Sequence, residues 1–177
     1  MVGTIEPRKG ILQVLEAVTQ LWEQGVPANL IIVGKLGWTS LSNDQRRTIP
    51  QIEAGLRTHS MLGKQLFWFE SASDEFLVWL YQHSNALICA SEGEGLGLPL
   101  IEAARMGLPI IARDLPVFRE VAKEGAYYFS ADDAQALANT LQLWLSLYGQ
   151  DAHPRSDAIK PASWHDSATD LLRHLLR

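Results

Sequence analysis

Short, wholly apolar runs alternate along this chain with longer segments of helical periodicity, and this alternation constrains the fold more than any other feature. Each run is about as long as a strand that is buried on both faces of a parallel sheet. The runs occupy 30–33, 66–69, 86–90 and 109–112, with the end of another at 1–3 and a further one at 127–129. We therefore expect about six strands.

Apolar residues recur at helical spacing between these runs. The expected helices cover 11–21, 43–61, 73–81, 98–106, 115–123, 132–147 and 164–176, and Pro50 should kink or divide the second of them. Strands that alternate with helices form a parallel sheet with helices on both faces. The sequence thus predicts an α/β fold, in which ligands bind at the carboxyl ends of the strands.

Composition excludes several classes of function. The chain has 177 residues and a net charge of −5, and no basic run exceeds two residues, so nucleic acid is not an expected partner. The single Cys89 rules out an internal disulfide and fits a reducing cytoplasm. The apolar runs are too short to span a bilayer, and the first ten residues lack the pattern of a signal peptide. The five histidines show no metal-ligand spacing, so no metal site is expected.

The segment 91–97 reads S-E-G-E-G-L-G and lies between a buried run and an expected helix. Glycines allow successive backbone N–H groups to face one concavity, and a helix N-terminus adds partial positive charge. A diphosphate would suit this place. A flexible strand-to-helix turn without a ligand explains the spacing equally well.

Glu94 and Glu102 are the two carboxylates beside this loop, the first within it and the second about one turn into the following helix. A carboxylate can accept hydrogen bonds from two vicinal hydroxyls, so the pair would suit a nucleotide sugar. From spacing alone, Glu102 on a solvated helix face is the stronger alternative. Glu92 is interpreted as a solvated residue at the rim.

Arg8 and Lys9 follow the first apolar run and precede the first helix. A helix N-terminus disfavours cations, so two of them there call for another reason, such as a bound diphosphate. An ordinary solvated pair is the alternative.

Three segments in this order resemble one known family. V-G-T-I-E-P-R-K-G at 2–10, I-I-V-G-K-L-G-W at 31–38 and the stretch E-G-L-G-L-P-L-I-E-A-A-R-M-G-L-P-I-I-A at 94–112 are similar to the C-terminal half of a GT-B glycosyltransferase of family 4. The resemblance covers essentially the whole chain, up to Ser163 and Trp164. It implies that residues 1–177 form a Rossmann-like, doubly wound, nucleotide-sugar-binding C-terminal domain, with an N-terminal acceptor domain absent.

The resemblance also implies roles for individual residues. Glu94 and Glu102 match the E-x7-E pair of the family, in which the first contacts the donor sugar and the second the ribose. Arg8 and Lys9 match the cations that stabilise the departing phosphate. Backbone near the diphosphate and sugar would come from Gly95, Leu96, Gly97 and Leu98, and backbone near the base from Ser71 and Ala72.

Thr4 departs from the family pattern, because many relatives have Arg there. The T-x-E-P-R-K variant is similar to that of O-antigen mannosyltransferase-like members. It leaves the phosphate charge to Arg8 and Lys9.

Together these expectations describe the donor half of a retaining hexosyltransferase of cell-surface polysaccharide synthesis. GDP-mannose is the first candidate donor and UDP-sugars are the next. The acceptor would be a glycan or a lipid-linked glycan held by the missing domain, no metal cofactor would be required, and the domain alone would be inactive. The full-length enzyme would be cytoplasmic, with peripheral association at the membrane. The alternatives are a non-catalytic nucleotide-binding or assembly module and a GT-B nucleotide-sugar epimerase.

Overall fold

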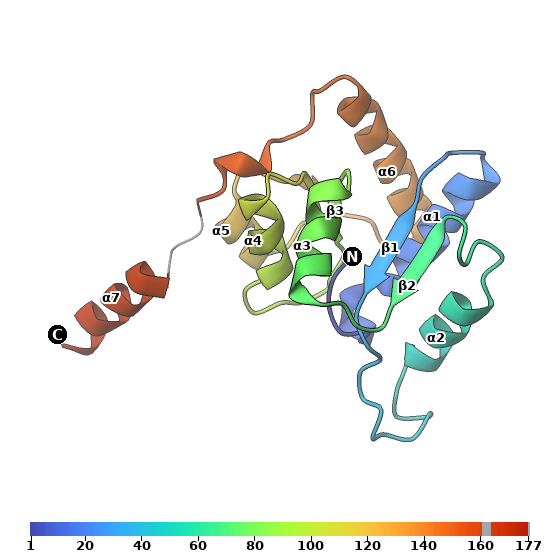
Figure 1. The fold of residues 1–177 in the computed structure, drawn as a ribbon, viewed down its shortest axis with the longest axis horizontal. Helices are drawn as coiled ribbons and strands as arrows, with labels where there is room; N and C mark the ends of the chain where they lie inside the picture. The colour runs from blue at the N-terminus through green and yellow to red at the C-terminus, as the bar shows by residue number, and fades with distance from the viewer. Residues whose placement is uncertain (161–163, 177) are drawn as a thin grey trace.

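The computed structural model of the chain describes residues 1–160 and 164–176. It confirms the α/β class: helices alternate with strands, and every pair of neighbouring strands is parallel (Figure 1). The described residues contain five strands, which are β1 (Leu30–Val33), β2 (Leu66–Phe69), β3 (Leu87–Cys89), β4 (Ile110–Arg113) and β5 (Tyr127–Phe129). β1 pairs with β2, and β3, β4 and β5 pair in that order.

The run at 1–3 does not form the further strand that was expected. A single parallel bridge joins Val2 to Val33, supported by hydrogen bonds from Gly3 N–H to Val33 O and from Val33 N–H to Met1 O, both of 2.9 Å. The chain then bends at Gly3, whose φ is 135°. One bridge is too short a ladder to count as a strand, so the expected number of about six is not confirmed.

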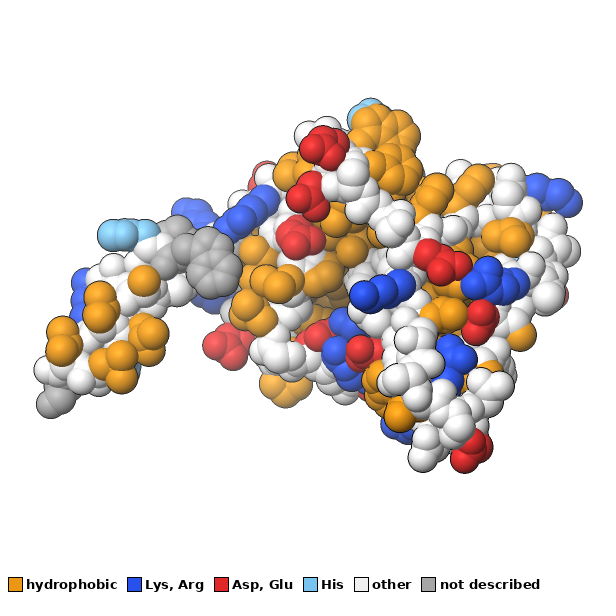
Figure 2. Space-filling view, turned by 60° about the horizontal axis from the view of Figure 1, so that its bottom comes forward, with side chains coloured by type: hydrophobic (Ala, Val, Ile, Leu, Met, Phe, Trp, Pro, Cys, Tyr) orange, Lys and Arg blue, Asp and Glu red, His pale blue; other side chains and the backbone are white. Residues whose placement is uncertain are grey.

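Helices occupy most of the expected segments. They are α1 (Ile11–Glu23), α2 (Ile49–Thr58), α3 (Asp74–His83), α4 (Leu98–Arg105), α5 (Pro116–Ala122), α6 (Ala134–Gly149) and α7 (Trp164–Leu175), with short 3-10 turns η1 (Pro7–Lys9) and η2 (Ser156–Ala158). α7 projects from the body of the molecule, and its exposed leucines are visible in Figure 2. Ser163, expected to matter at the start of this helix, lies outside the described residues.

The helix expected over 43–61 is shorter than predicted. α2 begins at Ile49, and residues 43–48 form turns instead. Pro50 lies in the first turn of α2 and does not divide the helix. Proline is favoured there because the first N–H groups of a helix have no intrahelical partner. The prediction of a proline-divided helix was therefore wrong.

The core consists of two layers, one on each face of the strands. Leu30, Ile32 and Ile111 pack with α1, α2 and α6 in one buried cluster. Ile110 and Ala112 pack with α4 and α5 in the other. Successive side chains of a strand point to opposite faces, so neighbours on β4 enter different clusters. This arrangement confirms the prediction of helices on both faces.

Candidate functional site

Two loops meet at the carboxyl ends of the strands, and together they form the candidate site. One is residues 3–10, which follow Val2, and the other is residues 91–97, which follow β3. Glu92 N–H donates a hydrogen bond of 2.7 Å to Arg8 O, and Arg8 Nη1 donates one of 2.8 Å to Gly93 O. These bonds hold the loop 3–10, with its cations, against the loop 91–97, with its carboxylates. The sequence singled out these two segments separately.

Glycine at position 10 makes this close approach feasible. Its φ is 65°, in the left-handed region, and a Cβ at this position would lie 2.3 Å from Ala90 O. Any other residue would therefore force the first loop away from the end of β3. The short distance between Lys9 and the 91–97 loop depends on this contact.

Glu94 lies at the centre of an ion-pair cluster. Lys9 Nζ is 2.5 Å from Glu94 Oε1, and Ser91 Oγ donates a 2.8 Å hydrogen bond to the same oxygen. Arg8 Nη1 is 3.1 Å from Glu94 Oε2, and Arg8 Nε is 2.9 Å from Glu6 Oε2. We call Arg8, Lys9, Ser91 and Glu94 the loop cluster. Figure 2, in which the bottom of Figure 1 comes forward, shows acidic and basic side chains side by side near the middle of the view.

The cluster holds Glu94 in its charged form. Burial by itself would raise the pKa of Glu94, but the hydrogen bonds from Lys9 and Ser91 and the charge of Lys9 outweigh it, so the pKa lies below its ordinary value. Burial likewise opposes the charge of Arg8, while Glu94 and Glu6 raise its pKa. Only 15% of the Lys9 side chain and 13% of the Glu94 side chain are exposed, whereas Arg8 is 46% exposed. Arg8 is therefore the cation more accessible to a ligand.

A cavity of about 20 Å³ lies next to the cluster, with Lys9, Ser91, Glu94, Gly97 and Phe118 among its lining residues. It has room for roughly one water molecule. A ligand as large as a nucleotide would have to bind over the open surface above it.

Glu102 lies on α4 and has a different partner. It is half-buried, and its Oε2 accepts a hydrogen bond of 2.8 Å from the hydroxyl of Tyr81 on α3. None of the hydrogen bonds and ion pairs of the described residues joins Glu102 to the loop cluster. Tyr81 is 5% exposed, and burial together with this hydrogen bond raises its pKa, so the phenol stays protonated and donates.

The other predicted residues surround the cluster. Leu96 and Leu98 are 51% and 55% exposed, while Gly97 is buried and begins α4 as its N-terminal cap. Gly95 is exposed, and a Cβ added there would meet no atom within 4 Å apart from its chain neighbours. Ser71 and Ala72 follow β2, at the end of the neighbouring strand pair. No hydrogen bond or ion pair among the described residues ties them to the loop cluster.

Sequence reasoning missed two polar residues of the site, Ser91 and Tyr81. Ser91 had a usable signal, because it is the first polar residue after a buried strand and stands at the sheet edge where ligands bind. Tyr81 had no such signal, because it occupies a core position of α3. Only the structure shows that its hydroxyl donates a hydrogen bond to Glu102.

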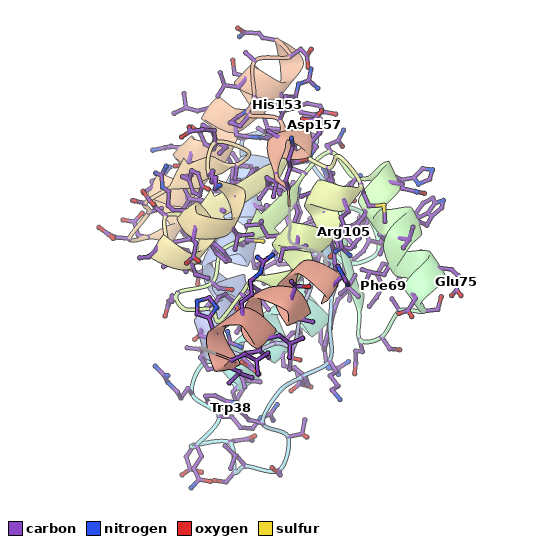
Figure 3. The ribbon with its side chains drawn as sticks, turned by 90° about the vertical axis from the view of Figure 1, so that its left-hand side faces the viewer. Trp38, Phe69, Glu75, Arg105, His153 and Asp157 are labelled. Carbon is purple, nitrogen blue, oxygen red and sulfur yellow. The ribbon has the colours of Figure 1, made fainter. Side chains whose placement is uncertain are left out.

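The region around His153 and Asp157 takes no part in the loop cluster. Figure 3 labels Trp38, in the loop after β1, at one end and His153 and Asp157 at the other. His153 is 8% exposed and its Nδ1 is 2.9 Å from Pro154 O. In the part of the chain that the structure describes, no group of three or more His, Cys, Asp or Glu residues is placed to bind a metal ion.

Comparison with known proteins supplies an independent observation. A family model described as "Glycosyl transferases group 1" matches residues 1–161. The chain is 50% identical over 175 residues to a serotype-specific mannosyltransferase, WbdA, of Escherichia coli. That match covers 99% of this chain and 20% of WbdA, so the chain spans about a fifth of the length of this relative.

A more distant relative and a solved structure agree with this match. The GDP-mannose:cellobiosyl-diphosphopolyprenol alpha-mannosyltransferase of Xanthomonas campestris is 29% identical over 142 residues, which cover 79% of this chain and 35% of that protein. Sucrose-phosphate synthase from Thermosynechococcus elongatus superimposes with a TM-score of 0.71 and 26% identity, covering 99% of this chain and 45% of the other.

Proposed function

This chain belongs to the glycosyl transferases group 1 family, and on that premise we propose that it binds the nucleotide-sugar donor of a retaining hexosyltransferase. GDP-mannose is the first candidate donor and UDP-sugars come next. The observation that carries this proposal is the loop cluster, in which Lys9 meets Glu94 across 85 positions of sequence and Arg8 contacts the same carboxylate. The name of the Xanthomonas relative, a GDP-mannose-dependent alpha-mannosyltransferase, supports the choice of sugar.

Arg8 and Lys9 would stabilise the diphosphate as it leaves. A positive group that is already held in position needs no reorganisation when negative charge develops, and that is the most effective form of electrostatic catalysis. The exposed guanidinium of Arg8 can form two parallel hydrogen bonds with phosphate oxygens. The N-terminus of α4, which begins beside the cluster at Leu98, adds partial positive charge. This set of charges would serve without a metal ion.

Glu94 would contact the transferred sugar. A carboxylate offers about four acceptor positions, and Lys9, Ser91 and Arg8 occupy three of them. One position remains for a sugar hydroxyl, and more become free as the cations turn to the diphosphate. Glu102 would accept hydrogen bonds from the ribose hydroxyls, with Tyr81 fixing the direction of its carboxylate.

The rest of the enzyme would bind the acceptor. We propose that the full-length protein has a second domain that binds a glycan or lipid-linked acceptor, and that it acts in the cytoplasm at the membrane surface. The name of the Xanthomonas relative, which gives a cellobiosyl-diphosphopolyprenol as acceptor, supports such an acceptor. Within the described residues, no helix is both long and apolar enough to cross a bilayer.

Calorimetric titration of the 177-residue chain tests the donor proposal. GDP and GDP-mannose should bind more tightly than UDP and UDP-glucose, and guanosine should bind weakly. Lys9→Ala should weaken the binding of GDP by roughly 1.5–3 kcal/mol, the range for a charge-assisted hydrogen bond, and leave guanosine unchanged. EDTA should have no effect on either protein.

Arg155→Ala provides the matched control. Arg155 also forms an ion pair, with its Nη2 2.7 Å from Asp151 Oδ2, but no hydrogen bond or ion pair among the described residues joins it to the loop cluster. Its loss should leave the binding of GDP unchanged. If Lys9→Ala and Arg155→Ala bind GDP equally well, the diphosphate does not lie on the loop cluster and the proposal fails.

The chain by itself should not transfer sugar, because the proposal gives it only the donor half of the site. Incubation with GDP-mannose and lipid-linked or glycan acceptors should release no GDP beyond spontaneous hydrolysis. Robust turnover would contradict the division into donor and acceptor domains.

A further inference from the structure

Arg113, the last residue of β4, joins the ends of the neighbouring strands β3 and β5. It is half-buried and lies on the same face of β4 as Ile111, the face that packs against α1. Its Nε donates a hydrogen bond of 3.1 Å to Ala90 O, directly after β3, and its Nη1 donates one of 3.1 Å to Ala131 O, after β5. Its Nη2 donates to Oε1 of Gln13 on α1. One guanidinium therefore holds three other segments of the chain.

The charge of Arg113 has no carboxylate partner. None of the ion pairs between described residues includes it, and its three hydrogen-bond acceptors are neutral oxygens. The carboxylate of the neighbouring Asp114 accepts hydrogen bonds of 2.7 and 2.8 Å from Arg119 instead. Withdrawal of a cation from water without a counter-ion costs free energy, so this placement calls for a specific role.

A single carbonyl, Ala90 O, connects this network to the loop cluster. Arg113 donates to it, and Gly10 packs against it so closely that a Cβ on Gly10 would lie 2.3 Å away. The next residue is Ser91, whose hydroxyl donates a hydrogen bond of 2.8 Å to Glu94. The orientation of the peptide between Ala90 and Ser91 therefore affects both loops that meet in the cluster.

Gln13 extends the network to the first turn of α1. It is half-buried and lies three residues after Gly10. Its Nε2 donates hydrogen bonds of 2.9 Å to Ala131 O and to Asp133 O, while its Oε1 accepts from Arg113. The start of α1 is thus tied to the ends of β4 and β5. A shift of one loop of the site away from the other would strain or break these bonds.

We propose that Arg113 is a positioning residue for the loop cluster. It fixes the Ala90 carbonyl relative to the first turn of α1, and in this way it sets the distance at which Lys9 and Glu94 meet. Each of its three nitrogens donates to the protein, so its role is separate from that of Arg8 and Lys9, which would bind the diphosphate. The importance of this positioning for binding rests on the proposed donor function of the cluster.

Arginine suits this place better than lysine. A guanidinium presents its N–H groups in a rigid planar fork, so each nitrogen can reach an acceptor on a different segment. A lysine ammonium keeps the charge, but it is a point donor on a flexible stem and would not hold three acceptors at a fixed spacing. Arg113→Lys therefore separates the geometry of the side chain from its charge.

Amide hydrogen exchange at Glu92 measures the contact between the two loops, because this N–H donates to Arg8 O across them. In Arg113→Lys we expect exchange at Glu92 to be about tenfold faster than in the unaltered chain, since both loops lose their shared anchor. The affinity for GDP should fall in the same variant, by roughly threefold to thirtyfold.

Trp22→Phe is the matched control. Trp22 Nε1 donates a hydrogen bond of 2.7 Å to Ala28 O from the last turn of α1, so its loss should destabilise the same helix at the end away from the loop cluster. Exchange at Glu92 should remain that of the unaltered chain. If Trp22→Phe accelerates this exchange as much as Arg113→Lys does, general loosening explains the effect and the proposal is wrong.

Gln13→Met covers the case in which Arg113→Lys does not fold. It removes one acceptor of Arg113 and leaves the other two, so exchange at Glu92 should become faster by a smaller factor. Unchanged exchange at Glu92 in the folded variants of Arg113 and Gln13 would overturn the proposal. Faster exchange with unchanged affinity for GDP would support the positioning role and contradict the donor function of the cluster, because exchange is measured without ligand.

Discussion

Lys9 Nζ lies 2.5 Å from Glu94 Oε1, although 85 residues separate the two in sequence. The sequence assigned the first residue to a diphosphate and the second to a sugar, and the structure holds them against each other. In the absence of ligand, the hydrogen bond from Lys9 and the charge of Lys9 help to lower the pKa of Glu94 and so keep its carboxylate ionised. A ligand that binds both must divide this pair, so its affinity will depend on how fully its own groups replace the broken contact.

Glu94 and Glu102 should respond differently to ligands. Glu102→Ala should weaken GDP and GDP-mannose about equally, by roughly 1–3 kcal/mol, because both carry the ribose hydroxyls. The affinity for a 2′,3′-dideoxy nucleotide, which lacks these hydroxyls, should not change. Glu94→Ala should weaken GDP-mannose selectively and should lower turnover in the full-length enzyme. Titration of both variants with the three ligands checks the assignment, and identical ligand profiles would refute it.

Tyr81→Phe should act through Glu102. Removal of the hydroxyl takes away the donor at 2.8 Å, so the carboxylate loses its fixed direction. We expect a loss of about 1–3 kcal/mol in stability and weaker binding of GDP, with the dideoxy nucleotide unaffected. Tyr128→Phe is the control, because its hydroxyl donates to the backbone at Phe118 and Lys123 and should cost stability alone. Equal affinity for GDP in both variants would leave Tyr81 with a purely structural role.

Gly97→Ala should destabilise the chain. The φ of Gly97 is 76°, and a Cβ there would lie 2.8 Å from the ring of Phe118, which is fully buried. Left-handed backbone and overpacking together should cost roughly 2–4 kcal/mol, measured by urea unfolding. Gly95→Ala should change stability by no more than about 0.5 kcal/mol, since nothing lies near that position. Comparable losses in both variants would indicate that the loop as a whole requires glycine.

The stability of the 177-residue chain should rise between pH 6 and pH 8. Burial lowers the pKa of the Met1 amino group from 8.0 to about 6, and the nearby Cys89 thiol stays neutral because burial raises its pKa to about 12. The unfolded chain therefore binds more protons than the folded chain in this window, and stability increases with pH by up to roughly 2–3 kcal/mol.

A chain that carries Gly-Ser-Gly-Ser fused before Met1 serves as the control for this titration. It replaces the amino group with an amide that can donate the same hydrogen bond to Ile31 O without a charge. Its urea-unfolding midpoint should rise less between pH 6 and pH 8 than that of the unextended chain. Parallel pH profiles of the two chains would show that the amino group titrates normally.

The sequence by itself determined the fold class and singled out the segments that form the candidate site. Runs such as 30–33 and 109–112 are apolar throughout, which is typical of a strand covered on both faces. The glycines of 91–97, with Glu94 inside that loop and Arg8 and Lys9 after the first run, marked the edge of the sheet where a ligand would bind. These patterns are local, because each depends on residues within about ten positions of one another.

Tertiary structure alone decided which of these groups meet. The contact of Lys9 with Glu94 depends on Gly10 packing against Ala90 O, and the contact of Tyr81 with Glu102 depends on two helices packing side by side. No local pattern encodes these distances, because packing between residues far apart in sequence sets them.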